Sequence, residues 1–170
     1  MKGSLRIAIL GTKFMGRVHS NAWRQVVPFF EPSIEPVRQV ACGRDPEATR
    51  NFADRWGWVE AETDWRRVVE RKDVDVIDLC MPQHLMAEVA IAAVENGKHV
   101  LCEKPMAMSW EEGQGMAEAA LRAGVVHQVN YNYRARKHID SNNLGPSYIV
   151  ALCVDIKFWA PHAIDAMLSP

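Results

Sequence analysis

The chain has 170 residues, of which 48% are hydrophobic and 24% charged, with 20 Lys and Arg against 21 Asp and Glu. That length accommodates one ordinary domain and a remainder, and the composition is that of a folded globular protein. A formal net charge of −1 gives no electrostatic basis for non-specific binding to nucleic acid or to an anionic membrane surface.

The hydrophobic pattern alternates between short apolar runs and longer amphipathic segments from residue 5 to about 130. The short runs predict strands at 5–10, 37–42, 58–61, 74–81, 99–102 and 125–130. The longer segments predict helices at 14–27, with Pro28 as the stop, and at 45–56, 64–70, 84–95 and 109–124. Strands alternating with helices predict an α/β fold with a doubly wound parallel sheet, the Rossmann type, over residues 1–130. Along the first helix one apolar face is expected to meet the sheet, formed by Phe14, Met15, Val18, Ala22 and Val26.

The remainder of the chain, residues 131–170, is polar at first and then carries an apolar segment predicted as a strand at 147–158. These 40 residues cannot bury a core of their own, so the segment is expected to pack on the first domain, on a second chain, or on nothing. Self-association is therefore predicted. The longest apolar stretch, 148–154, is too short for a membrane span, and no signal-peptide region opens the chain, which favours a cytoplasmic protein without a membrane partner.

The first predicted strand is followed at once by a turn that has glycine at both ends. A dinucleotide site needs glycine at the tight turn, at the point nearest the pyrophosphate, and where the helix packs on the strand. The chain keeps the first and third of these, Gly11 and Gly16, and has Lys13 in the middle, whose ammonium partly offsets its bulk. The alternative is a tight turn without a ligand. The expected cofactor-binding residues of this turn are Gly11, Thr12, Lys13, Phe14, Met15 and Gly16.

The second predicted strand ends in a glycine and an arginine instead of the acidic residue that binds the ribose of NAD. Gly43 is too small to repel a 2′-phosphate, and Arg44 can pair with one. These two residues favour NADP over NAD as the cofactor. The alternative is that Arg44 is a solvated loop residue and that Asp45, predicted as a helix cap, serves the cofactor weakly.

A third candidate segment, Glu103-Lys104-Pro105, directly follows the fifth predicted strand. Ligands of an open α/β sheet bind outside the carboxyl ends of its strands. A lysine placed there can approach a nicotinamide and a substrate alcohol together. The alternative is a surface lysine whose backbone is made rigid by the proline.

The four cysteines show neither the CxxC spacing of metal sites nor the framework of a secreted domain. Another strand is expected between Cys42 and Cys80, which puts them about 10 Å apart, outside one zinc shell. Cys80 and Cys102 are expected on neighbouring strands. We therefore expect the cysteines, including Cys153, to be reduced, and we expect no metal site.

Three segments together resemble the N-terminal domain of the glucose–fructose oxidoreductase, inositol dehydrogenase and MocA family. They are IAILGTKFMGRVHSNAW, DVDVIDLCMPQHLMAEVAIAAVENGKHVLCEKPMA, and the stretch from Asn130 to Arg134. The resemblance implies hydride transfer between a nicotinamide cofactor and a sugar, inositol or related polyol. Lys104 would move the substrate hydroxyl proton, and Met81, Pro82 and Glu103 would line the nicotinamide side of the pocket.

The chain also departs from this family. Gln83 and Met86 stand where the family often has asparagine and histidine, and we expect most of the second domain, which normally supplies the substrate pocket, to be missing. Residues 131–170 are expected to be a truncated remnant of that domain, with His162 only faintly similar to its catalytic histidine. The competing hypothesis is a non-catalytic nucleotide-binding or dimerisation module.

Overall fold

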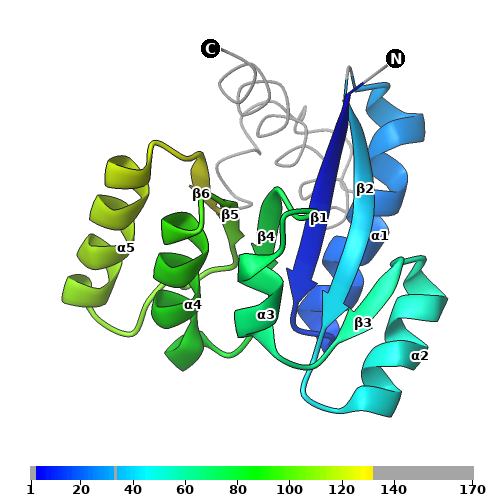
Figure 1. Cartoon of the computed structure of the whole chain (residues 1–170), viewed down its shortest axis with the longest axis horizontal. Coiled ribbons are helices and arrows are strands. Elements are labelled where there is room, and N and C mark those ends of the chain that lie inside the picture. The colour runs from blue at the N-terminus through cyan, green and yellow to red at the C-terminus, as the bar shows by residue number, and fades with distance from the viewer. Residues whose placement is uncertain (1–2, 33, 132–170) are drawn as a thin grey trace, which may run out of the picture.

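The computed structural model describes residues 3–32 and 34–131, which form one parallel sheet with helices on both faces (Figure 1). The strands are β1 (Ser4–Leu10), β2 (Glu35–Cys42), β3 (Glu60–Glu62), β4 (Val76–Leu79), β5 (His99–Cys102) and β6 (His127–Val129). The helices are α1 (Phe14–Phe30), α2 (Pro46–Trp56), α3 (Trp65–Glu70), α4 (Gln83–Glu95) and α5 (Trp110–Ala123). The order β3-β2-β1-β4-β5-β6 confirms the predicted doubly wound sheet. Among the described helices, none has the length and apolar character needed to cross a membrane.

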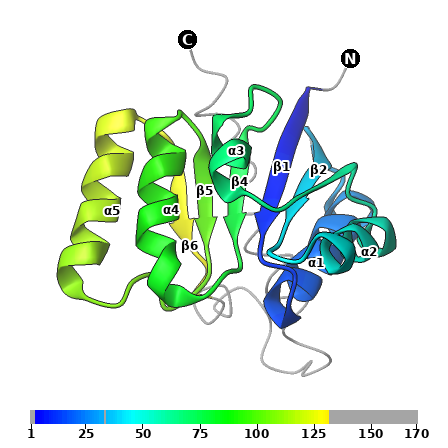
Figure 2. The same cartoon turned by 60° about the horizontal axis from the view of Figure 1, so that its bottom comes forward.

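The two faces of the sheet are covered by separate sets of helices (Figure 2). Ile7 and Ile9 of β1 share a buried cluster with Trp23 of α1 and with residues of α2. The alternate residues of the same strand, such as Leu10, enter a second cluster with α3, α4 and α5. Because successive side chains point to opposite faces and both faces are buried, the central strands β1, β4 and β5 are mostly apolar in the sequence.

Helix ends follow the capping signals of the sequence. Asp45 precedes α2 and accepts a hydrogen bond from the Ala48 N–H at 2.7 Å, and Pro46 occupies the first helical position. Ser109 precedes α5 in the same way and accepts from the Glu112 N–H at 3.2 Å. These contacts define the residues at which α2 and α5 begin.

Helix α1 differs from its prediction in length and in its buried face. It runs through Pro28 to Phe30, although Pro28 has no backbone N–H to donate within the helix. Phe14, expected on the sheet side, is 66% exposed. The helix turns Gly16 toward the sheet, and the buried stripe that follows includes Trp23, which is 1% exposed.

The strand ends lie in one row across the sheet. Leu10 pairs with Cys42 on one side and with Leu79 on the other, Leu79 pairs with Cys102, and Cys102 pairs with Val129. The turns that follow these strands therefore emerge at one edge. The strand order reverses between β1 and β4, the switch point at which such sheets bind ligands.

This order also confirms the expected placing of the cysteines on the sheet, with β1 between Cys42 and the β4 end that bears Cys80. Cys102 ends the neighbouring strand β5. All three are free thiols. The predicted strand at 147–158, Cys153 and His162 lie outside the described residues.

Candidate functional site

The turn after β1 has a backbone that only glycine fits at its first position. Gly11 has a φ of +114°, and a Cβ there would lie 2.3 Å from the Cys80 carbonyl oxygen at the end of β4. The Gly11 N–H donates to the Cys42 carbonyl at 2.9 Å. The turn is thus held against β2 on one side and β4 on the other, at the switch point.

Gly16 brings the start of α1 into direct contact with the same turn. A Cβ on Gly16 would lie 1.9 Å from the Gly11 carbonyl oxygen and 3.6 Å from the Phe52 ring. Lys13 is the N-cap residue of α1, and no described side chain caps the helix there. The N–H groups at the start of a long helix therefore face the sheet edge, an arrangement that favours an anion.

The end of β2 lies beside this turn. A Cβ on Gly43 would be 2.5 Å from the Thr49 hydroxyl oxygen and 3.0 Å from the Thr12 side chain. The glycine therefore permits close packing, a role that the sequence analysis did not give it. Arg44 is exposed, and Asp45 is already bonded to the backbone as a helix cap.

The turn after β4 forms the other side of the switch point. A Cβ on Gly11 would come within 3.0 Å of the Met81 amide nitrogen, so the two turns are in close contact. Pro82 is exposed and is the N-cap residue of α4. The Gln83 side chain donates to the Ala107 carbonyl, which ties the start of α4 to the segment after β5.

Lys104 lies next along the edge, after β5. Its side chain is exposed, whereas Glu103 is only 3% exposed. The Lys104 backbone N–H donates to Glu103 Oε2 at 3.1 Å. The structure thus brings together the turns that follow β1, β2 and β4, and it places Lys104 after β5 at the same edge of the sheet. That these residues bind a cofactor stays a prediction.

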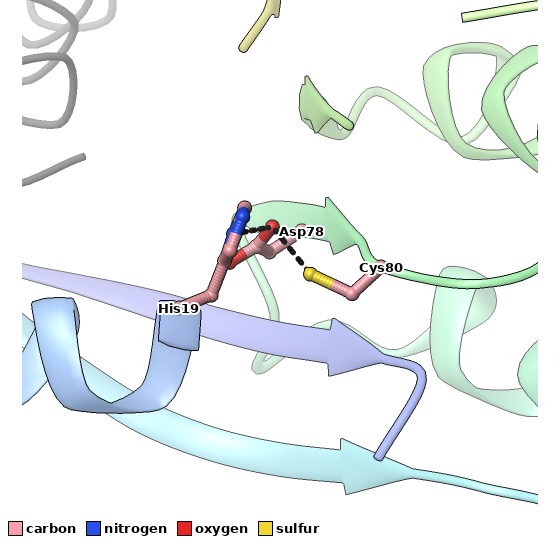
Figure 3. Close-up of side chains that lie close together, drawn as sticks. All are labelled: His19, Asp78 and Cys80. Atoms are coloured by element: carbon pink, nitrogen blue, oxygen red, sulfur yellow. Dashed lines mark hydrogen bonds and ion pairs between the residues drawn. The ribbon is translucent and has the colours of Figure 1, made fainter. Parts of the chain in front are cut away.

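A buried polar network was missed in the sequence analysis, and Figure 3 shows three of its members, His19, Asp78 and Cys80. His19 of α1 places Nδ1 at 2.8 Å and 3.0 Å from the two Asp78 carboxylate oxygens, and Nε2 at 3.1 Å from Glu103 Oε1. The Trp23 Nε1–H donates to Asp78 Oδ2 at 2.8 Å, and the Asn130 amide donates to Glu103. The available signal was Asp78 itself, a carboxylate inside an apolar strand, which requires a buried partner.

His19 is held as an imidazolium by this geometry. Both ring nitrogens lie within hydrogen-bond distance of carboxylate oxygens, and a ring that donates from both nitrogens satisfies them. Burial opposes the charge, but the Asp78 carboxylate and the Cys80 side chain together outweigh it and hold the pKa of His19 well above 6.5. Burial, with the Asp78 charge adding to it, raises the pKa of the Cys80 thiol to about 12, so that thiol remains protonated at neutral pH.

His19, Asp78 and Cys80 also form the one described cluster whose spacing suits a metal ion, with ligand atoms within 4.8 Å of one another. A metal needs a neutral imidazole and a thiolate. Without a metal, the ring and the thiol are both protonated, so an ion would have to displace a proton from each.

We expect the network to make stability fall as the pH rises. The raised pKa of His19 means that its stabilisation is complete below the unfolded value of 6.5 and is lost as the pH rises through the higher folded value. The groups facing the ring are Asp78, Cys80 and Glu103. Urea unfolding at several pH values should show the wild type losing stability at high pH relative to His19→Gln, and a difference independent of pH would contradict this.

The chain matches the profile of the oxidoreductase family with an NAD-binding Rossmann fold over residues 5–131. A curated relative, the levoglucosan dehydrogenase of Pseudarthrobacter phenanthrenivorans, is 39% identical over 150 residues, which cover 84% of this chain and 38% of that protein. The scyllo-inositol 2-dehydrogenase (NAD(+)) of Bacillus subtilis is 27% identical over 153 residues, covering 85% of this chain and 43% of that protein. The chain thus spans about two fifths of the length of these relatives.

Solved structures of oxidoreductases also match most of this chain and about two fifths of their own length. An oxidoreductase domain protein from Kribbella flavida superposes with a TM-score of 0.76 and 44% identity, covering 85% of this chain and 40% of that one. A levoglucosan dehydrogenase in complex with NADH superposes with a TM-score of 0.75 and 37% identity, covering 84% of this chain and 40% of that one.

Proposed function

We propose a function from the family to which the chain belongs, the glucose–fructose oxidoreductase, inositol dehydrogenase and MocA family of oxidoreductases with an NAD-binding Rossmann fold. The chain binds a nicotinamide dinucleotide for the oxidation or reduction of a sugar or polyol. The observation that carries the proposal is the β1–α1 turn, where a Cβ on either Gly11 or Gly16 would meet backbone atoms. Relatives named as levoglucosan and scyllo-inositol dehydrogenases support the substrate class.

The residues of the site fit such a cofactor. The N-terminus of α1, which packs on the glycine turn, would hold the pyrophosphate, and Lys13 would add a positive charge beside it. Thr12, Gly43 and Arg44 would contact the ribose of the adenosine half, and Met81 and Pro82 would line the nicotinamide side. Such a cofactor would supply reversible hydride transfer to and from the carbinol carbon of the substrate.

In this proposal Lys104 is the catalytic residue. Its exposed side chain follows β5 at the edge where the cofactor site lies. The amine takes the proton of the substrate hydroxyl during oxidation and returns it during reduction. Glu103 does not reach the substrate in this scheme, because its carboxylate is bonded to His19 and Asn130.

The function is tested by titrating the purified chain with NADH and, separately, NADPH while nicotinamide fluorescence is followed. We expect saturable binding, and then cofactor reduction with a member of a sugar and polyol screen that includes levoglucosan and inositols. No binding of either dinucleotide would contradict the proposal. Binding without turnover would favour the non-catalytic module. The assignment of residues 131–170 to a substrate domain, a cytoplasmic location and self-association stay predictions.

The choice between NADP and NAD is a finer proposal. Relatives named with NADH and NAD(+) favour NAD, whereas Gly43 and Arg44 favour NADP. If Arg44 pairs with a 2′-phosphate, Arg44→Ala should weaken NADPH binding about tenfold and leave NADH binding unchanged. Arg50→Ala, an exposed arginine of α2, is the matched control. Tighter binding of NADH by the wild type would contradict the NADP preference.

A further inference from the structure

We infer that His19 is a positioning residue for the turn that carries Lys104, an inference that rests on the proposed role of Lys104. The structural basis is a continuous chain of contacts from α1 to that turn. His19 Nε2 lies 3.1 Å from Glu103 Oε1, and Glu103 Oε2 accepts the Lys104 N–H at 3.1 Å. One buried carboxylate thus contacts the ring with one oxygen and the catalytic turn with the other.

The charge on His19 is what keeps this carboxylate in place. Asp78 is fully buried and Glu103 is 3% exposed, and two carboxylates in an interior repel each other unless a cation lies between them. The imidazolium occupies that position, with a ring nitrogen toward each carboxylate. Without it, Glu103 would take up a proton or turn away from the interior, and in either case Oε2 would hold the Lys104 amide less well.

The same contacts join the two halves of the proposed site. His19 belongs to α1, the helix whose first turn packs on Gly11. Glu103 directly follows β5 and precedes Lys104. Asn130, after β6, donates to the Glu103 oxygen that faces the ring and so fixes the carboxylate from a third element. The network therefore sets the lysine turn relative to the helix that receives the dinucleotide.

The experiment compares His19→Gln with Trp23→Phe in the complete 170-residue chain. Both variants alter a buried hydrogen bond from α1 to Asp78, but only the first removes the positive charge between Asp78 and Glu103. We expect the Lys104 backbone amide to exchange with solvent deuterium about tenfold faster in His19→Gln, as loss of a hydrogen bond to a charged group implies, and at the wild-type rate in Trp23→Phe. Equal effects, or no effect of His19→Gln, would overturn the inference.

A second measurement does not require the variants to fold. Nitrogen NMR of the wild type labelled at histidine should show one ring, His19, with both nitrogens protonated above neutral pH, and a neutral ring would overturn the inference. Both readouts are made without cofactor or substrate. A failure of dinucleotide binding or turnover would therefore count against the proposed function, while the amide and ring measurements would still decide the role of His19.

Discussion

Gly16→Ala is expected to weaken dinucleotide binding about a hundredfold, as the loss of two charge-assisted hydrogen bonds would do. The new Cβ would lie 1.9 Å from the Gly11 carbonyl oxygen, a backbone atom that cannot move without shifting the turn. The N–H groups that would hold the pyrophosphate shift with it. Overpacking should also lower the free energy of unfolding by about 1–3 kcal/mol. The measurements are NADH titration by fluorescence and urea unfolding.

The matched control is Gly115→Ala, the same substitution within α5. A Cβ there would have its nearest neighbour, Ile91 Cδ1, at 4.0 Å, so nothing needs to move. Alanine should then stabilise the helix by about 0.5–1 kcal/mol and leave dinucleotide binding unchanged. If Gly16→Ala bound NADH as tightly as the wild type, the turn could not be the phosphate site.

The sequence was sufficient for this turn because its requirements are local. Gly11 and Gly16 are separated by a fixed number of residues between a strand and a helix; Gly11 needs its positive φ and Gly16 contacts the Gly11 carbonyl, although Gly11 also packs against Cys80 of the distant β4 turn. The alternation of strands and helices was predictable for a similar reason, since strands buried on both faces consist of apolar residues. Strand limits were less certain: β4 covers Val76–Leu79 within the predicted 74–81, because apolar side chains continue into the flanking turns.

The buried network of His19, Asp78 and Glu103 could not be predicted from the alternation of apolar and polar residues along the chain. Asp78 inside β4 indicated a buried charge, but its partner His19 is 59 residues away, and Glu103 is 84 residues from His19. Only the packing of α1 on β4 and β5 brings the three together. The buried face of α1 was predicted correctly at Ala22 and Val26 but wrongly at Phe14, which is 66% exposed.

Lys104→Met is expected to lower turnover by about a hundredfold to ten-thousandfold, the usual contribution of a positioned acid or base. Methionine keeps the length and most of the apolar contacts of lysine but can neither accept nor return the hydroxyl proton. The Lys104 backbone N–H, which Glu103 Oε2 accepts, is retained in this variant. NADH affinity should therefore stay within about twofold of the wild type, because the contacts proposed for the phosphates are made elsewhere.

The control is Lys72→Met, an exposed lysine before β4 and so at the opposite edge of the sheet. It makes the same change in charge far from the strand ends, and turnover should be unchanged. Rates of cofactor reduction and NADH titrations on the two variants separate chemistry from binding. Turnover that survives Lys104→Met would remove the lysine from the mechanism, while a parallel loss of NADH affinity would make it a cofactor-binding residue instead.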